Sequence, residues 1–243
     1  MPKRNSEHAK RTFSRRNQEE KSQIELVSRK NSILAAAENF GFDVASIVNI
    51  NETKNLEVEL RQFLEKKHHG EMEWLDKKKE FRSDPKKLWR EAKSVIVLGS
   101  NYHFETNSLD LLNQKNKGII SVYARSRDYH LSIKKKLKAF SKWISDNYQC
   151  QIKFFVDTAP VMEKPLAMQA GIGWQGKHTN LVSKEYGSWL FLSSIFLDIE
   201  FNSNPESKNH CGSCTQCIDI CPTNAIVEPY KIDAKKCISY LTI

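Results

Sequence analysis

Residues 210–222 read His210-Cys211-Gly212-Ser213-Cys214-Thr215-Gln216-Cys217-Ile218-Asp219-Ile220-Cys221-Pro222. The spacing, C-x2-C-x2-C-x3-C-P, is typical of bacterial iron–sulfur proteins, in which three thiolates bind one cluster and the fourth binds another. A zinc site would more naturally use two separated C-x2-C pairs or a mixture of Cys and His. A disulfide framework needs an oxidising compartment, which nothing in the sequence indicates. The run therefore favours iron–sulfur clusters over zinc and predicts a protein that transfers electrons.

The number of cysteines limits the clusters that this chain can ligate. Two four-iron clusters need four thiolates each. The sequence has six cysteines, and one of them, Cys150, lies far upstream of the run. Cys237 is a candidate fifth ligand, so the set is incomplete. We expect either that one cluster is built differently or that the chain stops before its remaining ligands.

Length and composition divide the chain into parts. With 243 residues, it can form one medium domain and one small domain. Residues 1–23 carry seven Lys or Arg against three Glu and have few apolar side chains, so we predict a disordered basic tail. We predict a catalytic domain over residues 24–201, a boundary over residues 202–208 and a small cysteine-containing domain over residues 208–243.

The charge and the apolar runs bear on partners and location. The longest apolar run, residues 189–197, is too short to cross a bilayer, and the sequence begins without an apolar signal core. We therefore predict a cytoplasmic protein with reduced thiols and no membrane partner. The formal net charge of +9 would attract polyanions. Lysines on solvated helix faces would give the same charge.

Hydrophobic periodicity predicts helices alternating with strands. Predicted helices run from residue 24 to Gly41, over residues 56–64 and onward from an N-cap at Asp128, and Asp84-Pro85 resembles another helix start. Predicted strands cover residues 44–48, 94–99, 119–124 and 151–156, and residues 180–183 and 188–197 are predicted to form a hairpin. Residues 94–99 are continuously apolar, as in a strand buried on both faces. The fold class is α/β or α+β, with a layered domain around a central sheet.

Asp157 directly follows the strand predicted over residues 151–156. A carboxyl at the carboxyl end of a sheet strand lies where open α/β sheets bind ligands. Apolar neighbours could keep such a carboxyl protonated near neutral pH, which would make it a general acid. The alternative is that Asp157 is a turn or cap residue.

Residues 171–178, GIGWQGKH, contain a formal G-x-G-x-x-G. Nucleotide-binding loops of this kind need a strand before them and a helix after them. Here the preceding residues 162–170 are predicted to be helical, so the nucleotide interpretation fails. One remaining possibility is a loop that approaches a flat or bulky ligand, with Lys177, His178 and Asn180 as polar groups. The other is a tight connection that packs Trp174 into the core.

Several separated motifs, taken together, resemble epoxyqueuosine reductases. They are residues 157–164 (DTAPVMEK), 170–177 (AGIGWQGK) and 187–189 (GSW), the cysteine run, residues 237–243 (CISYLTI) and, upstream, residues 123–125 (YAR) and 128–130 (DYH). The resemblance covers residues 24–243. It implies a cobalamin-dependent enzyme with two [4Fe–4S] clusters, similar to corrinoid reductive dehalogenases, with a ferredoxin-like iron–sulfur domain after the catalytic domain. The implied reaction removes the epoxide oxygen of epoxyqueuosine at the wobble position of tRNA.

The resemblance also implies roles for individual residues. Asp157 would be the proton donor. The cobalamin-binding region would include Tyr123, Asp157, Trp174, Gly176, Lys177, His178, Asn180 and Ser239. Cys211, Cys214 and Cys217 would ligate the first cluster, and Cys221 and Cys237 the second. The second C-x2-C run of the family is missing, so we expect a C-terminally truncated form.

The implied partners are the anticodon loop of tRNA and an external low-potential electron donor, with the protein as a monomer. Three alternatives stay open at this point. Another corrinoid and iron–sulfur reductase would act on a small organic substrate, such as a halide. A non-catalytic electron-transfer protein would need only the cysteine domain, and a zinc-stabilised RNA-binding protein would hold no iron.

Overall fold

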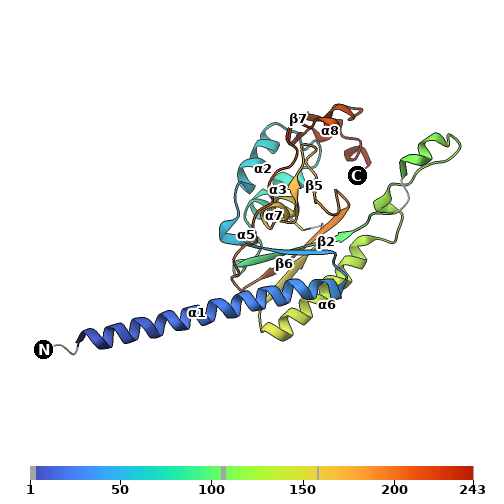
Figure 1. Cartoon of the computed structure of the whole chain (residues 1–243). Coiled ribbons are helices and arrows are strands. Elements are labelled where there is room, and N and C mark those ends of the chain that lie inside the picture. Colours follow the sequence, from blue (N-terminus) through green and yellow to red (C-terminus); the bar gives the residue numbers. More distant parts are fainter. Residues whose placement is uncertain (1–3, 105–107, 158, 243) are drawn as a thin grey trace. The chain divides into compact units, whose positions relative to one another are not determined.

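The computed structural model of the chain describes residues 4–104, 108–157 and 159–242. It divides into two compact units, Met1–Ala36 and Ala37–Ile243. The first unit is a single helix, α1 (Arg4–Ala36), drawn in blue in Figure 1. The prediction of disorder over residues 1–23 is therefore wrong for residues 4–23. Lys, Arg, Glu and Gln are good helix formers even where the sequence has no apolar face.

The second unit is built on a sheet of four antiparallel strands. These are β1 (Val44–Asn49), β2 (Ser94–Asn101), β6 (Leu190–Leu197) and β3 (Ile152–Phe155), in the spatial order β1-β2-β6-β3. The strands predicted over residues 44–48, 94–99 and 151–156 are confirmed. Strand β2 is central and is buried from Ser94 to Ser100, which agrees with its continuous apolar sequence.

Helices cover both faces of this sheet (Figure 1). On one face, α7 (Glu163–Gln169) buries Leu166 and Ala167 against Val95, Val97 and Phe196. The long helix α6 (Tyr129–Tyr148) contacts β3 and β6. Its buried stripe is the predicted one, made of Ile133, Leu137, Phe140 and Ile144. The layered α/β fold class is confirmed, although the strands are all antiparallel.

Short helices connect β1 to β2 and β2 to α6. The first group contains η2 (Ile50–Glu52), α2 (Leu56–Glu65), α3 (Trp74–Lys77), α4 (Lys79–Ser83) and α5 (Pro85–Leu88), and the second contains η3 (Ser108–Asn113) and η4 (Val122–Ala124). The predicted cap of α5 is confirmed, because a carboxylate oxygen of Asp84 accepts a hydrogen bond of 2.9 Å from the Lys86 N–H. The 3₁₀ helix η1 (Ala37–Phe40) ends at Gly41, whose φ is 81°.

Two predicted β-elements are wrong. Residues 119–124 form no strand, and η4 occupies their second half. Their apolar side chains have no sheet to join, and Ile120 is exposed. The predicted hairpin is replaced by a different pairing: β5 (Leu181–Val182) pairs with β4 (Trp174–Gln175), while β6 pairs with β2 and β3. A single bridge between Ser183 and Gly187 remains of the predicted hairpin.

The cysteine-containing segment is small and irregular. It contains α8 (Gln216–Asp219), β7 (Ile226–Glu228), β8 (Lys231–Ile232), η5 (Ala234–Lys236) and η6 (Tyr240–Thr242). The Ala234 N–H donates to the His68 carbonyl at 2.8 Å, and the Glu71 N–H donates to the Tyr240 hydroxyl at 2.8 Å. The segment is thus fastened to the loop after α2.

The predicted boundary over residues 202–208 is not a free linker in the structure. The Asn204 N–H donates to the Ile47 carbonyl at 2.8 Å, and the Ser203 hydroxyl accepts from the Asn49 N–H at 2.9 Å. These bonds hold the segment along β1. No helix within the described residues is both long enough and apolar enough to span a membrane.

Candidate functional site

Asp157 lies just beyond β3 in a left-handed backbone conformation, with φ of 50°. Its Oδ2 accepts a hydrogen bond of 3.1 Å from the Tyr129 hydroxyl and lies 2.8 Å from Nε2 of His130. The other ring nitrogen of His130, Nδ1, lies 2.8 Å from Oδ1 of Asp128. Asp128 is also the N-cap of α6. The start of α6 therefore presents two hydrogen-bonding side chains to Asp157.

The charges in this cluster support one another. The hydrogen bond to Asp157 raises the pKa of His130, and the bond to Asp128 raises it further. The same contact with His130 lowers the pKa of Asp128. Burial raises the pKa of Tyr129, and the nearby charge of Asp157 adds to this effect. His130 therefore favours its protonated form, which can donate a hydrogen bond to each of the two carboxylates.

The environment of Asp157 differs from the predicted one. Enclosure by apolar neighbours was the predicted reason for a protonated carboxyl, but the Asp157 side chain is 57% exposed. The apolar side chains of β3 pack into the sheet; for example, the Phe155 ring meets the Phe196 ring at 5.0 Å. Proton-donating neighbours, rather than apolar burial, characterise this site.

A second carboxyl, Glu163, lies beside Asp157 at the start of α7. Its Oε1 accepts from the Asp157 N–H at 3.4 Å. Burial, helped by the nearby charge of Asp157, raises the pKa of Glu163 to about 8. The Arg82 guanidinium interacts electrostatically with both carboxyls and lies 4.8 Å from the centre of the Trp74 ring. The sequence interpretation missed Glu163 and Arg82 as site residues, although Glu163 belongs to the motif that begins at Asp157.

The polar candidates of the glycine-rich stretch come together in the tight turn between β4 and β5. The Gly176 N–H donates to the Asn180 carbonyl at 2.8 Å, and Nδ1 of His178 accepts from the Asn180 N–H at 3.1 Å. The ammonium of Lys164, on α7, donates to Oδ1 of Asn180 at 3.0 Å. This bond ties the turn to the helix that begins beside Asp157.

Two glycines before this turn are required by the packing of the chain itself. A Cβ at Gly171 would lie 2.3 Å from the Pro205 carbonyl oxygen, and a Cβ at Gly173 would lie 2.3 Å from the Val182 carbonyl oxygen. The tight-connection interpretation therefore explains these positions. Trp174 is only partly buried, yet its Nε1 is enclosed and has no hydrogen-bond partner among the described residues. This indole N–H is a buried donor that the described residues leave without an acceptor.

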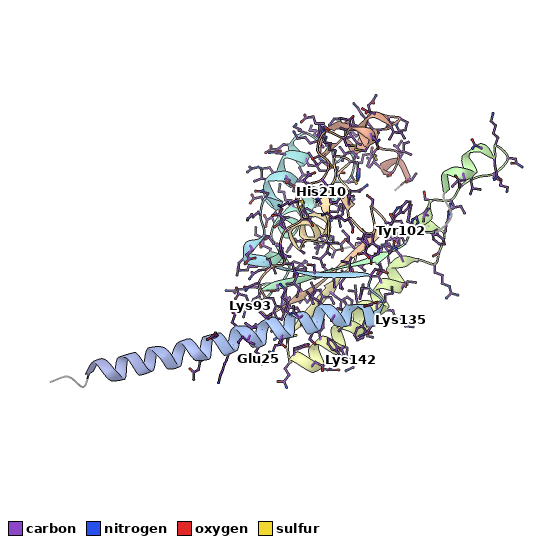
Figure 2. The ribbon with its side chains drawn as sticks, in the orientation of Figure 1. Glu25, Lys93, Tyr102, Lys135, Lys142 and His210 are labelled. Atoms are coloured by element: carbon purple, nitrogen blue, oxygen red, sulfur yellow. The ribbon has the colours of Figure 1, made fainter. Side chains whose placement is uncertain are left out.

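The Lys177 side chain is buried, and its ammonium contacts the cysteine loop. Its ammonium donates to the carbonyls of Gly212 and Cys214, both at 2.8 Å. Its own carbonyl accepts from the Tyr230 N–H at 2.9 Å. Lys177 was predicted as a polar group facing a ligand, but it connects the β4–β5 turn to the cysteine loop. Next to it, the His210 ring packs edge-on against Trp174 at 4.9 Å, and Figure 2 labels His210.

We expect Lys177→Met to loosen the cysteine loop. Methionine keeps most of the length of the side chain but leaves the two carbonyls without their charged donor, which costs about 1–3 kcal/mol. Urea unfolding should show this loss, and hydrogen exchange should show faster exchange across residues 211–221. Lys184→Met, at an exposed lysine, is the matched control. Equal protection of the loop in both variants would contradict the role given to Lys177.

The thiols of the cysteine run have the chemistry that a cluster needs. All six cysteines are free, and Cys211, Cys217, Cys221 and Cys237 are partly buried while Cys214 is exposed. Sγ of Cys221 accepts from the Ala225 N–H at 3.3 Å. Hydrogen bonds from the backbone of Thr223 and Ala225 lower the pKa of Cys221 to about 7, which favours the thiolate that binds iron.

Among residues 4–104, 108–157 and 159–242, no three His, Cys, Asp or Glu side chains lie close enough to hold one metal ion. A four-iron cluster is held by four separate thiolates, each on its own iron, so its ligands stay further apart.

Like Asp157, the predicted cofactor-binding residues Tyr123 and Ser239 lie outside the β4–β5 turn. Tyr123 belongs to η4 and is 53% exposed. Ser239 is exposed between η5 and η6. Neither shares a described hydrogen bond with the turn, so their roles remain predictions.

Comparisons with known proteins show which family the chain resembles. The family model described as epoxyqueuosine reductase QueG, DUF1730, matches residues 82–158, and the 4Fe-4S double cluster binding domain matches residues 210–243. An epoxyqueuosine reductase of Cyclobacterium marinum is 41% identical over 209 residues, which are 85% of this chain and 66% of that protein. That of Synechocystis is 40% identical and covers 81% of this chain and 68% of its own length. That of Escherichia coli is 38% identical over 84% of this chain and 54% of its own length.

Solved structures give the same result for the fold. A crystal structure of epoxyqueuosine reductase with an epoxyqueuosine-modified tRNA-Tyr stem loop has a TM-score of 0.75 and 26% identity, covering 89% of this chain and 58% of that one. The enzyme of Bacillus subtilis, with its catalytic loop swung out of the active site, has a TM-score of 0.76 and 25% identity and covers 89% of this chain and 57% of that one. The chain thus spans between about half and two thirds of the length of these relatives.

Proposed function

This chain belongs to the epoxyqueuosine reductase family, and we propose that it reduces epoxyqueuosine to queuosine at the wobble position of tRNA. The observation that carries the proposal is the position of Asp157. Its carboxyl is held by Tyr129 and His130 at the end of β3. The same compact unit contains the cysteine run, which Lys177 fastens to the neighbouring turn. A proton donor and an electron-transfer segment are thus combined in one unit.

The proposal includes two kinds of cofactor. When bound, cobalamin would supply a strong cobalt nucleophile, and [4Fe–4S] clusters would supply low-potential electrons. Cys211, Cys214 and Cys217 would hold one cluster, and Cys221 and Cys237 would contribute to another. The unpartnered indole N–H of Trp174, together with Gly176, His178 and Asn180, would face the cobalamin. The lowered pKa of Cys221 supports the cluster assignment.

The residues of the chain would supply the protons that the reaction needs. Conversion of an epoxide to an alkene takes two electrons and two protons and releases the oxygen as water. Asp157 would deliver a proton to the departing oxygen, and His130 would reprotonate Asp157. Tyr129 keeps the carboxyl in place through its bond of 3.1 Å. Glu163, whose pKa is raised to about 8, is a second store of protons beside the backbone of Asp157.

The proposed substrate is tRNA, which would bind the protein through its anticodon loop. A relative crystallised with a tRNA stem loop supports this choice. Helix α6 carries exposed lysines, of which Lys135 and Lys142 are labelled in Figure 2. The segment before α6 adds Arg125 and Arg127. Such side chains position a nucleic acid through its phosphates. We further propose that the protein works as a monomer in the cytoplasm with an external low-potential electron donor.

The direct test is an anaerobic assay. The chain is reconstituted with iron, sulfide and cobalamin, reduced, and incubated with a tRNA stem loop that contains epoxyqueuosine. We expect the modified nucleoside to lose the mass of one oxygen atom, and we expect no conversion without cobalamin. A small organic halide serves as the second substrate. Reduction of the halide without any change in the nucleoside would overturn the proposal in favour of another corrinoid reductase.

A further inference from the structure

A row of aromatic rings leads away from Asp157. The first ring is Tyr129, whose hydroxyl donates to Asp157. Tyr129 stacks on Phe191 with 4.0 Å between ring centres and 5° between ring planes. Phe191 in turn stacks on Tyr102 at 4.2 Å, and Tyr102 meets Trp189 edge-on at 5.6 Å. The rings therefore form a continuous path from the acidic side chain.

The sheet holds this row in place. Tyr102 directly follows β2, and Trp189 directly precedes β6. The Tyr102 N–H donates to the Trp189 carbonyl at 2.9 Å, which continues the pairing of the two strands beyond their ends. Figure 2 labels Tyr102 at this end of β2. The row is thus fixed to rigid strands rather than to a loose loop.

The outer end of the row is open. Trp189 is 38% exposed, and the His103 ring, which lies 5.3 Å from it, is exposed too. The inner rings Phe191 and Tyr102 are partly buried. A row that served only to fill the core would have its largest ring enclosed, as Phe140 and Phe196 are. Here the largest ring faces outward.

We propose that Trp189 and His103 form a stacking platform for an unpaired RNA base next to the nucleotide that reacts. Unpaired bases of RNA loops are recognised by stacking on aromatic side chains, including Trp, Tyr and His. The inner end of the row meets the proton donor, so a base on the outer end would be a neighbour of the reacting one. The net charge of +9 favours an RNA occupant. This inference rests on the proposed function and adds a recognition surface to it.

The test measures binding without turnover. An unmodified anticodon stem loop is titrated into wild-type protein, Trp189→Ala, Trp189→Phe and His103→Ala at several salt concentrations. Base–aromatic stacking is worth ~1–3 kcal/mol, so Trp189→Ala should weaken binding by about 5- to 150-fold. Trp189→Phe should keep most of the affinity. The dependence on salt should stay the same, because stacking releases no counterions.

Phe81→Ala removes an exposed aromatic ring outside the row and is the matched control. Equal affinities of wild type, Trp189→Ala and His103→Ala would overturn the platform, even if epoxyqueuosine is still reduced. A wild-type protein that binds no RNA would overturn both the platform and the proposed function. Binding that depends on Trp189, without any reduction of epoxyqueuosine, would keep the platform and remove the proposed activity. Thermal unfolding of each variant shows whether it has folded.

Discussion

Asp157→Asn is expected to lower the single-turnover rate of epoxyqueuosine reduction by about 10²–10⁴-fold, the usual contribution of one general acid. Asparagine has nearly the same shape and can still bond to Tyr129 and His130, but it has no acidic proton. We expect the fold and cobalamin binding to be unchanged. The rate is measured by rapid quench with pre-reduced enzyme, so that electron supply does not limit it.

The control for this variant is Asp146→Asn. Asp146 is an exposed residue of α6 that pairs with Lys142 at 2.8 Å, away from the Asp157 cluster. The Asp146→Asn variant should reduce epoxyqueuosine at the wild-type rate. An unchanged rate in Asp157→Asn would show that the proton of the departing oxygen comes from another group, with Glu163 as the next candidate because its pKa is about 8.

The affinity for tRNA is expected to fall steeply with salt. Each neutralised phosphate contributes a slope of roughly 0.7 to 0.9 in log affinity against log salt. About six contacts would lower the affinity about 10³-fold between roughly 50 and 200 mM salt. The candidate residues are Arg125, Arg127, Lys134, Lys135, Lys138 and Lys142. Filter binding or fluorescence anisotropy with a tRNA stem loop measures the slope.

Single substitutions show which residues contribute to the salt dependence of binding. Lys134→Gln and Lys135→Gln should each lower the slope by the contribution of about one phosphate contact, roughly 0.7 to 0.9. Lys93→Gln is the control, because Lys93 is exposed just before β2, at the opposite end of this strand from Tyr102 (Figure 2). Lys136 and Lys142 are not substituted, because the Lys136 ammonium donates to the Gly41 carbonyl at 2.6 Å and the Lys142 ammonium donates to Asp146 at 2.8 Å. A flat salt dependence would mean that these lysines only solvate the helix.

Features that depend on neighbours in the chain were predicted correctly. The cap at Asp128 and the buried stripe of α6 follow from helical spacing, and β2 follows from its continuous apolar run. The cysteine spacing predicted the segment that matches the cluster-binding family. Each of these patterns spans fewer than about twenty residues, and within that length the geometry of a helix or strand decides which side chains share a face.

Short sequence patterns did not predict which strands pair with one another. Residues 119–124 have the composition of a strand, but the central sheet consists of β1, β2, β6 and β3, and these residues pair with none of them. In the same way, β5 pairs with β4 rather than with the nearby β6. Strand propensity expresses the fit of a side chain to a half-buried pleated surface, and the rest of the fold supplies that surface.

The sequence by itself predicted several of the longer helices, most of the central strands, the likeness to a family and Asp157 as a candidate residue. Only the tertiary structure decided what these residues contact. It placed His130 against Asp157, and it placed Glu163, whose pKa is raised, beside them. It also placed the Lys177 ammonium on the carbonyls of the cysteine loop. These partners are separated by up to dozens of residues in the chain. Their distances follow from the packing of α6, α7 and the sheet, which no local periodicity encodes.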